Sequence, residues 1–243
     1  MGDISAASKQ ILEELKVNII ALLSSSPPPP NPTNHALFQN LYINKILPVE
    51  EATSYNSFGH SPLNAGEFDS PPLVLLVGPY SAGKTTFIEH IIGKTFPGQR
   101  VGPEPTTDKF CAVLHGKEER VIPGNALTVA PGTPFKGLQM FGNNFLTRFE
   151  GSQVDADILR NMTLIDSPGV LSGDKQTLGR SYSYNEVLNW FAERSDMIIL
   201  LFDVSKVSLI QSPLALRKTR ILAMNQHPRN CHPFWLHQHP LLN

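Results

Sequence analysis

The chain has 243 residues, 41% hydrophobic and 17% charged, which is enough for one globular α/β domain with additional segments. Its formal net charge of −1 gives no overall attraction to nucleic acid, and we expect no nucleic-acid partner. The two cysteines, Cys111 and Cys231, lie far apart, which excludes a disulfide framework and indicates a reducing, cytoplasmic compartment. No apolar run approaches the ~20 residues of a membrane-spanning helix, so we expect any membrane contact to be peripheral.

The first segment, residues 1–34, is predicted to be an amphipathic helix followed by a Pro-rich linker. Apolar side chains recur at helical spacing from Ser8 to Leu23, and three serines and four prolines follow from Ser24 to Pro30. The helix could dock on another helix or lie on a lipid surface. Packing within the chain is favoured, because its polar face mixes both charges.

Residues 35–72 are predicted as a helical lead-in, with a helix from Ala36 to Ile46 and a long connection from Pro48 to Pro72. Apolar runs and helices then alternate up to residue 206. The predicted strands are Leu73–Val77, Phe110–Leu114, Met162–Ile165 and Met197–Phe202, and the predicted helices follow Lys84 and cover Asn185–Arg194. Apolar strands separated by helices indicate a three-layer α/β sandwich with a mainly parallel sheet.

A G-x-x-x-x-G-K-T sequence, Gly78-Pro-Tyr-Ser-Ala-Gly-Lys-Thr85, lies between the first strand and the following helix. Such a loop turns its backbone N–H groups, and the positive end of the helix, towards phosphate oxygens. Lys84 would reach the β- and γ-phosphates, and the Thr85 hydroxyl would bind Mg²⁺. A glycine-rich turn without a ligand is the alternative. The predicted nucleotide-binding residues of this loop are Gly78, Ser81, Ala82, Gly83, Lys84, Thr85 and Thr86.

Two further segments follow in the order expected of a nucleotide switch. Leu164-Ile-Asp-Ser-Pro-Gly169 ends a strand in a carboxylate, so Asp166 would hold Mg²⁺ through water and the Gly169 N–H would approach the γ-phosphate. Before the second strand, Thr107 would complete the metal shell. An ordinary turn at Asp166 and an ordinary Pro-rich loop at Thr107 are the alternatives.

The last segment, residues 207–243, is predicted to be a disordered tail. It shows neither strand alternation nor helical period, and it contains no N-K-x-D sequence to read a guanine base. The spacing of its His and Cys residues fits no zinc pattern, so a disordered tail is favoured over a metal site. Those residues are His227, Cys231, His232, His237 and His239. The strand Met197–Phe202 would then be a sheet edge unless the tail covers it.

Leu41 to Lys206 resembles the EH-domain-containing (EHD) subfamily of dynamin-related ATPases. The matching segments include Lys45-Ile-Leu-Pro-Val-Glu-Glu, Gly102-Pro-Glu-Pro-Thr-Thr-Asp, Val121-Ile-Pro-Gly-Asn-Ala-Leu, Asp166-Ser-Pro-Gly-Val-Leu-Ser-Gly and Trp190-Phe-Ala-Glu-Arg. Two positions depart from the family: Pro79 stands where it usually has Gln, and Ser167 where it has Thr. The later strands and domains of the family are missing, so we expect a nucleotide-binding domain that is incomplete at its C-terminal end.

The resemblance implies a dynamin-type P-loop fold that binds ATP, or GTP, with Mg²⁺. It also implies oligomers with itself or with relatives, peripheral binding to endosomal or plasma membranes, and a role in membrane remodelling and endocytic recycling. Matching the family motifs assigns phosphate and Mg²⁺ binding to Lys84, Thr85, Thr107 and Asp166. Ser81 and Thr107 are the catalytic candidates, and no residue is assigned as a base. A GTPase of the same fold and a non-catalytic fragment that dimerises with full-length relatives are the alternatives.

Overall fold

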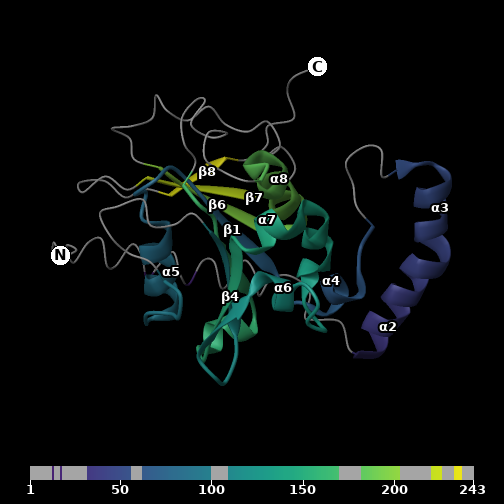
Figure 1. Cartoon of the computed structure of the whole chain (residues 1–243), viewed down its shortest axis with the longest axis horizontal. Helices are drawn as coiled ribbons and strands as arrows, with labels where there is room; N and C mark the ends of the chain where they lie inside the picture. The colour runs from purple at the N-terminus through teal and green to yellow at the C-terminus, as the bar shows by residue number, and fades with distance from the viewer. Residues whose placement is uncertain are drawn as a thin grey trace, which may run out of the picture.

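In a computed structural model of the protein, the described residues form an eight-stranded sheet of order β3-β4-β2-β5-β1-β6-β7-β8 (Figure 1). The described residues are Glu13, Val17, 32–55, 62–99, 109–169, 182–202, 220–225 and 233–236. The strands are β1 (Leu73–Val77), β2 (Phe110–His115), β3 (Arg120–Pro123), β4 (Phe149–Val154), β5 (Thr163–Asp166), β6 (Met197–Phe202), β7 (Arg220–Asn225) and β8 (Pro233–Leu236).

Helices lie on both faces of this sheet, which confirms the predicted three-layer sandwich. Successive side chains of a strand point to opposite faces, and every residue of β1 is buried. Val74 and Leu76 belong to the core on the face covered by α5 (Lys84–Ile92), whereas Leu73, Leu75 and Val77 belong to the core under α8 (Tyr184–Arg194). The other elements of that second face are α6 (Gly124–Leu127), the 3-10 helix η3 (Pro134–Phe141) and α7 (Gly142–Leu146). A short 3-10 helix, η4 (Asp157–Arg160), adds Leu159 to the first face.

The pairing at the centre of the sheet sets the position of the candidate site. β1 pairs in parallel with both β5 and β6, so the carboxyl ends of the three strands meet at one edge. β2 runs antiparallel to β5, with Cys111 opposite Asp166. Four of the seven pairings are parallel, so the sheet is mixed, with a parallel majority.

The prediction of only four strands is wrong. β4 was missed because two of its buried residues are polar: Ser152 is inaccessible, and Glu150 forms an ion pair with Lys109 at 2.7 Å. β7 and β8 lie in the segment that was predicted to be disordered, and β7 pairs in parallel with all of β6. β6 is therefore an interior strand. The remaining tail residues, including the five His and Cys residues considered as metal ligands, lie outside the described residues.

The lead-in is more helical than predicted. α2 (Pro32–Leu41), the π-helix η1 (Tyr42–Ile46) and α3 (Leu47–Ala52) follow one another without a break beside the sheet (Figure 1). Helix therefore begins inside the predicted linker and continues into the predicted connection, because proline is tolerated in the first turn of a helix. Of the predicted N-terminal helix, only Glu13 and Val17 are described, and both are helical. None of the helices in these described ranges has the length and apolar character that crossing a bilayer requires.

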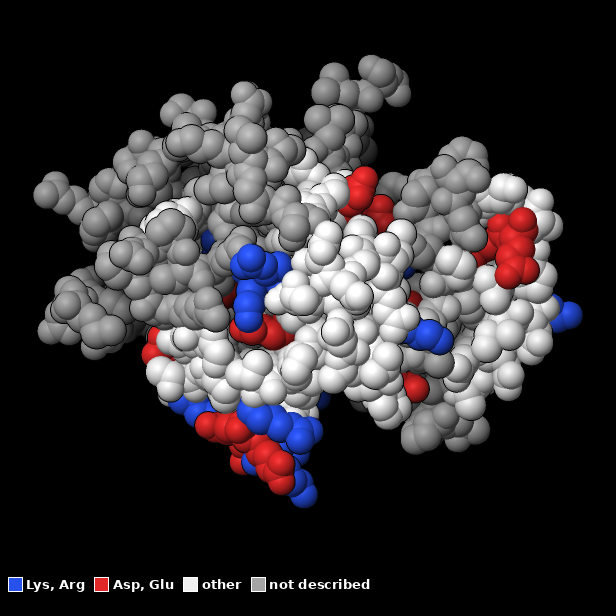
Figure 2. Space-filling view, viewed as in Figure 1, with Lys and Arg blue, Asp and Glu red and all other residues white. Residues whose placement is uncertain are grey.

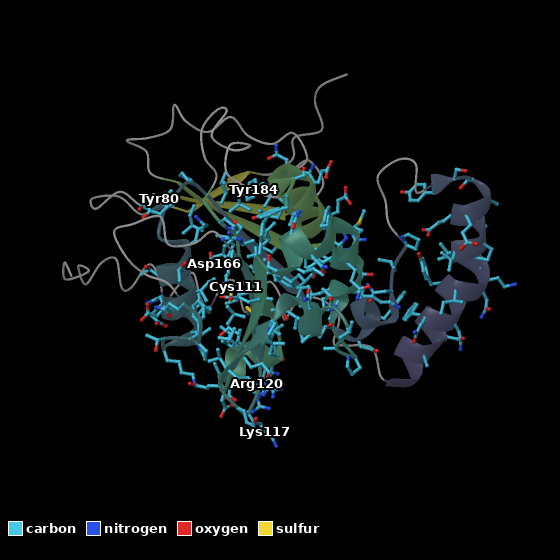
Figure 3. The ribbon with its side chains drawn as sticks, viewed as in Figure 1. Tyr80, Cys111, Lys117, Arg120, Asp166 and Tyr184 are labelled. Carbon is cyan, nitrogen blue, oxygen red and sulfur yellow. The ribbon has the colours of Figure 1, made fainter. Side chains whose placement is uncertain are left out.

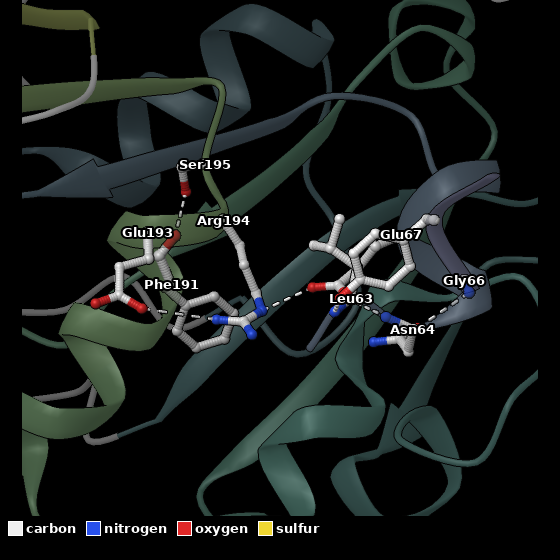
Figure 4. A network of polar contacts seen from close by, with 9 residues as sticks. Leu63, Asn64, Gly66, Glu67, Phe191, Glu193, Arg194 and Ser195 are labelled. Carbon is white, nitrogen blue, oxygen red and sulfur yellow. Dashed lines mark hydrogen bonds and ion pairs between the residues drawn. The ribbon is translucent and has the colours of Figure 1, made fainter. Parts of the chain in front are cut away.

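A buried ion pair fastens the last helix of the lead-in, α4 (Ala65–Asp69), to α8 (Figure 4). Arg194 Nε lies 2.7 Å from Glu67 Oε1, and the two side chains are only 8% and 10% exposed. The Arg194 guanidinium also lies 4.2 Å from the centre of the Trp190 ring, a favourable cation–π distance. Glu67 completes a capping box with Asn64 at the start of α4, so one carboxylate both caps this helix and docks it.

Removing the carboxylate of this pair should destabilise the fold. Glu67→Ala leaves the Arg194 charge buried without its nearest partner, and we expect a loss of about 3 kcal/mol in unfolding free energy, measured by urea denaturation. Glu119→Ala breaks the half-exposed pair with Lys94 and should cost less than about 1 kcal/mol. Equal losses in the two variants would contradict the docking role of Glu67.

Candidate nucleotide-binding site

The loop between β1 and α5 has the curled backbone that phosphate binding needs. β1 ends at Val77, and α5 begins at Lys84 directly after Gly83. Gly83 has φ 79° and ψ 21°, in the left-handed region that glycine adopts without strain. Ser81 has φ 58° although it is not glycine, and such strained positions are common at functional sites. The loop therefore delivers the N-terminus of α5 to the carboxyl end of β1.

Lys84 points into this loop. Its side chain is only 6% exposed, and its Nζ donates hydrogen bonds to the carbonyl oxygens of Gly78 and Pro79, each at 3.0 Å. Burial lowers the pKa of Lys84, and the charge of Asp166 partly offsets this shift. The ammonium group is thus held at the centre of the loop by neutral carbonyl groups, which an anionic phosphate could replace with a stronger interaction.

Asp166 ends β5 next to the loop. The Thr85 hydroxyl donates a hydrogen bond of 2.6 Å to Asp166 Oδ2, while Oδ1 is buried and has no hydrogen-bond partner among the described residues. Burial raises the pKa of Asp166, against the opposing effects of the Thr85 hydrogen bond and the Lys84 charge. A hydroxyl and a carboxylate oxygen therefore lie together where a hard cation could bind.

The turn after Asp166 is fixed against the loop. The Ser167 hydroxyl donates to the carbonyl oxygen of Leu76 in β1 at 2.6 Å. Gly169 lies so close to the loop that a Cβ atom there would be 2.7 Å from Tyr80 Cα and 2.8 Å from Tyr80 N. Figure 3 labels Tyr80, in the loop, and Asp166, at the end of β5. Only glycine fits at this position, because any side chain would meet the backbone of Tyr80.

The structure brings together most of the predicted site residues. Lys84, Thr85 and Asp166 are linked as described above, and Gly78, Gly83 and Gly169 shape the same region. The Ala82 N–H donates to the Pro79 carbonyl at 3.3 Å, whereas Ser81 and Thr86 are exposed. Thr107 lies outside the described residues, although Cys111, four positions later, lies opposite Asp166 in the sheet.

Pro79 and Ser167, the two departures from the family pattern, both take part in the local geometry. Pro79 has no N–H to offer, but its carbonyl accepts hydrogen bonds from Lys84 and Ala82. Ser167 keeps a hydroxyl that ties the turn to β1. Neither contact could be predicted from the sequence, because every residue type carries the same backbone carbonyl acceptor.

Charged side chains also gather away from the loop. In the described ranges as a whole, no group of three or more His, Cys, Asp or Glu side chains is placed to hold a metal. Figure 2 shows acidic and basic side chains mixed at the lower tip of the molecule, where Figure 3 labels Lys117 and Arg120. Arg120 Nη1 lies 4.0 Å from Glu118 Oε2 there, and Lys94 pairs with Glu119.

The comparisons with known proteins agree with this geometry. The family profile described as "Dynamin family" matches residues 74–225, and the profile "N-terminal EH-domain containing protein" matches residues 38–69. The chain is 54% identical over 172 residues to EH domain-containing protein 1 of Homo sapiens and of Bos taurus, and 52% identical to EH domain-containing protein 3 of Homo sapiens. Each match covers 70% of this chain and 32% of the relative, so the chain spans about a third of the length of these relatives.

A solved structure of an oligomerised bacterial dynamin pair is also similar, at 16% identity and a TM-score of 0.39. The match covers 66% of this chain and 26% of that one. This similarity is too weak to support a conclusion about the fold or the function of the chain.

The buried carboxylate predicts a pH-dependent stability. Because the folded pKa of Asp166 is raised, the folded protein keeps a proton that the unfolded chain releases above pH of about 4. Stability in the absence of ligand should therefore fall as the pH rises from there through the raised pKa. Asp166→Asn should be more stable than wild type at pH 7 and equally stable near pH 3, measured by urea unfolding.

The exposed Asp157 provides a control, because its side chain is 94% exposed. Asp157→Asn should change stability by less than about 0.5 kcal/mol at either pH. An Asp166→Asn variant that is less stable than wild type at pH 7 would contradict the raised pKa.

Proposed function

The chain belongs to the dynamin family, and we propose that it binds a nucleoside triphosphate together with Mg²⁺ at the carboxyl ends of β1 and β5. The observation that carries the proposal is the convergence of the Lys84 ammonium, the Thr85 hydroxyl and the Asp166 carboxylate on one loop. These groups come from segments 81 positions apart, between Thr85 and Asp166, and their contact is what a P-loop and a switch strand need.

The phosphate chain would lie against the loop 78–85, with Lys84 exchanging its two carbonyl contacts for phosphate oxygens. The N-terminus of α5 supports this assignment, since backbone N–H groups of a first helical turn have no partner within the helix. The curled backbone at Ser81 and Gly83 supports it further. Ser81 matches the P-loop serine of the family and is the proposed contact for the oxygen that bridges the β- and γ-phosphates. Thr107 is the proposed partner of the γ-phosphate and the metal.

The residues present also fit a divalent cation. Asp166 Oδ1 is a buried acceptor with no hydrogen-bond partner in the described part of the chain, and Thr85 Oγ1 is already beside Oδ2. Thr85 would bind Mg²⁺ directly and Asp166 would hold it through water. When bound, Mg²⁺ neutralises charge on the phosphate oxygens. The chain's own residues orient the phosphates, and Ser167 and Gly169 keep the switch turn against the loop.

We further propose that the protein prefers ATP and hydrolyses it. We also propose that it forms oligomers, binds membranes peripherally and acts in endocytic recycling. These proposals are supported by the 54% identity to EH domain-containing protein 1, of which this chain spans about a third. Competition between fluorescent ATP and GTP analogues tests the base preference. Nucleotide turnover with and without liposomes separates an active enzyme from a non-catalytic fragment. A non-catalytic fragment should show no turnover in either case and should still pull down an intact relative.

Lys84→Ala should weaken nucleotide binding at least about tenfold, because it removes charge-assisted hydrogen bonds to the phosphates. Isothermal titration with ATP·Mg²⁺ and with GTP·Mg²⁺ measures the effect. Lys136→Ala removes an exposed lysine and should leave both affinities unchanged. Wild-type affinity in Lys84→Ala would remove the loop from the proposed site.

A further inference from the structure

Tyr184, the first residue of α8, contacts the switch turn although no sequence motif singled it out. Its hydroxyl donates a hydrogen bond of 3.0 Å to the carbonyl oxygen of Pro168. Pro168 stands between Ser167, which is tied to β1, and Gly169, which lies against the loop. The turn is therefore held by one side-chain hydrogen bond from within and by another from a separate helix.

The Pro168 carbonyl and the Gly169 N–H belong to the same peptide group. A peptide group is planar and trans, so its C=O and N–H point in opposite directions and rotate together. Fixing the direction of the Pro168 carbonyl therefore fixes the direction of the Gly169 N–H. The sequence pattern predicts that this N–H approaches the γ-phosphate of a bound nucleotide.

Tyr184 is well placed to fix that direction, because its own position is set by the core. The side chain is only 3% exposed, and its ring centre lies 5.8 Å from that of Phe110 in β2. Phe110 stacks in turn on Phe191 of α8 at 5.2 Å. A buried ring between a strand and its own helix has little freedom to move, so its hydroxyl presents a fixed donor to the turn.

The opposite side of the turn faces the phosphate loop. The close approach of Gly169 to the backbone of Tyr80 leaves no room for a side chain at residue 169. In Figure 3, Tyr80 and Tyr184 are labelled on either side of Asp166 in the upper half of the view. The peptide between Pro168 and Gly169 is thus bounded by α8 through Tyr184 and by the loop through Tyr80.

We propose that Tyr184 is a positioning residue: its hydroxyl aims the Gly169 N–H at the terminal phosphate and so helps the site to distinguish a triphosphate from a diphosphate. This inference rests on the proposed nucleotide site. It assigns to Tyr184 an effect on the γ-phosphate alone, because in the proposed site the α- and β-phosphates, which a diphosphate also carries, would be held by the loop 78–85.

The test is Tyr184→Phe, which removes the hydroxyl and keeps the buried ring. Dissociation constants are measured for fluorescent, non-hydrolysable ATP and GTP analogues and for the matching diphosphates, all with Mg²⁺. Loss of one neutral hydrogen bond should weaken triphosphate binding about three- to tenfold and leave diphosphate binding unchanged. A purely structural role would change both affinities alike, so an unchanged ratio of the two overturns the proposal.

Tyr182→Phe is the matched control, because Tyr182 belongs to the same aromatic cluster around Phe110. It should leave the ratio at the wild-type value, and an equal change of the ratio in both variants overturns the proposal. If Tyr184→Phe does not fold, 3-fluorotyrosine at position 184 takes its place. Its more acidic hydroxyl is a stronger donor, so the ratio should shift in favour of the triphosphate, and no shift overturns the proposal. Wild-type protein that binds neither nucleotide contradicts the proposed function itself.

Discussion

The site depends on two opposite charges that are buried at the carboxyl ends of neighbouring parallel strands. Lys84 follows β1 and Asp166 ends β5, and each is almost inaccessible. Burial disfavours the charged form of both groups, and each partly offsets that cost for the other. In the proposed site, a bound phosphate would stabilise the charged form of Lys84, and a divalent cation would stabilise the charged form of Asp166. In open α/β sheets, ligands generally bind at the carboxyl ends of the parallel strands.

The surrounding structure keeps this arrangement from relaxing. The Asp166 turn is bonded to β1 through Ser167 and to α8 through Tyr184, and α8 is fastened at its other end to the lead-in through Glu67 and Arg194. The two ends of one helix thus contact the candidate site and the segment before the sheet. Among the described residues, the Tyr184 hydrogen bond and the packing around it link the turn directly to α8.

Local sequence patterns were sufficient to predict the centre of the fold and the loop. β1 and β6 are continuous apolar runs, and Gly83 and Lys84 lie in a motif whose geometry the backbone reproduces. β4 was not predicted, because its buried residues include the polar Ser152 and Glu150, and the partner of Glu150, Lys109, lies 41 positions away in the sequence. β7 and β8 lack a clear period and are recognised only through pairing with β6 and with each other. The contact between Tyr184 and a backbone carbonyl likewise could not be predicted, because it does not depend on the type of residue that supplies the carbonyl.

In the proposed site, Lys84, Thr85 and Asp166 converge on a triphosphate and its metal ion. A crystal structure with a non-hydrolysable triphosphate analogue and Mn²⁺ in place of Mg²⁺ is the sharpest test of this arrangement, because anomalous scattering locates the metal independently of the phosphates. We expect the Mn²⁺ peak beside Thr85 Oγ1 and Asp166, and Lys84 Nζ on the phosphates in place of the Gly78 and Pro79 carbonyls. Phosphates bound elsewhere, or Lys84 still bonded to both carbonyls with nucleotide present, would contradict it.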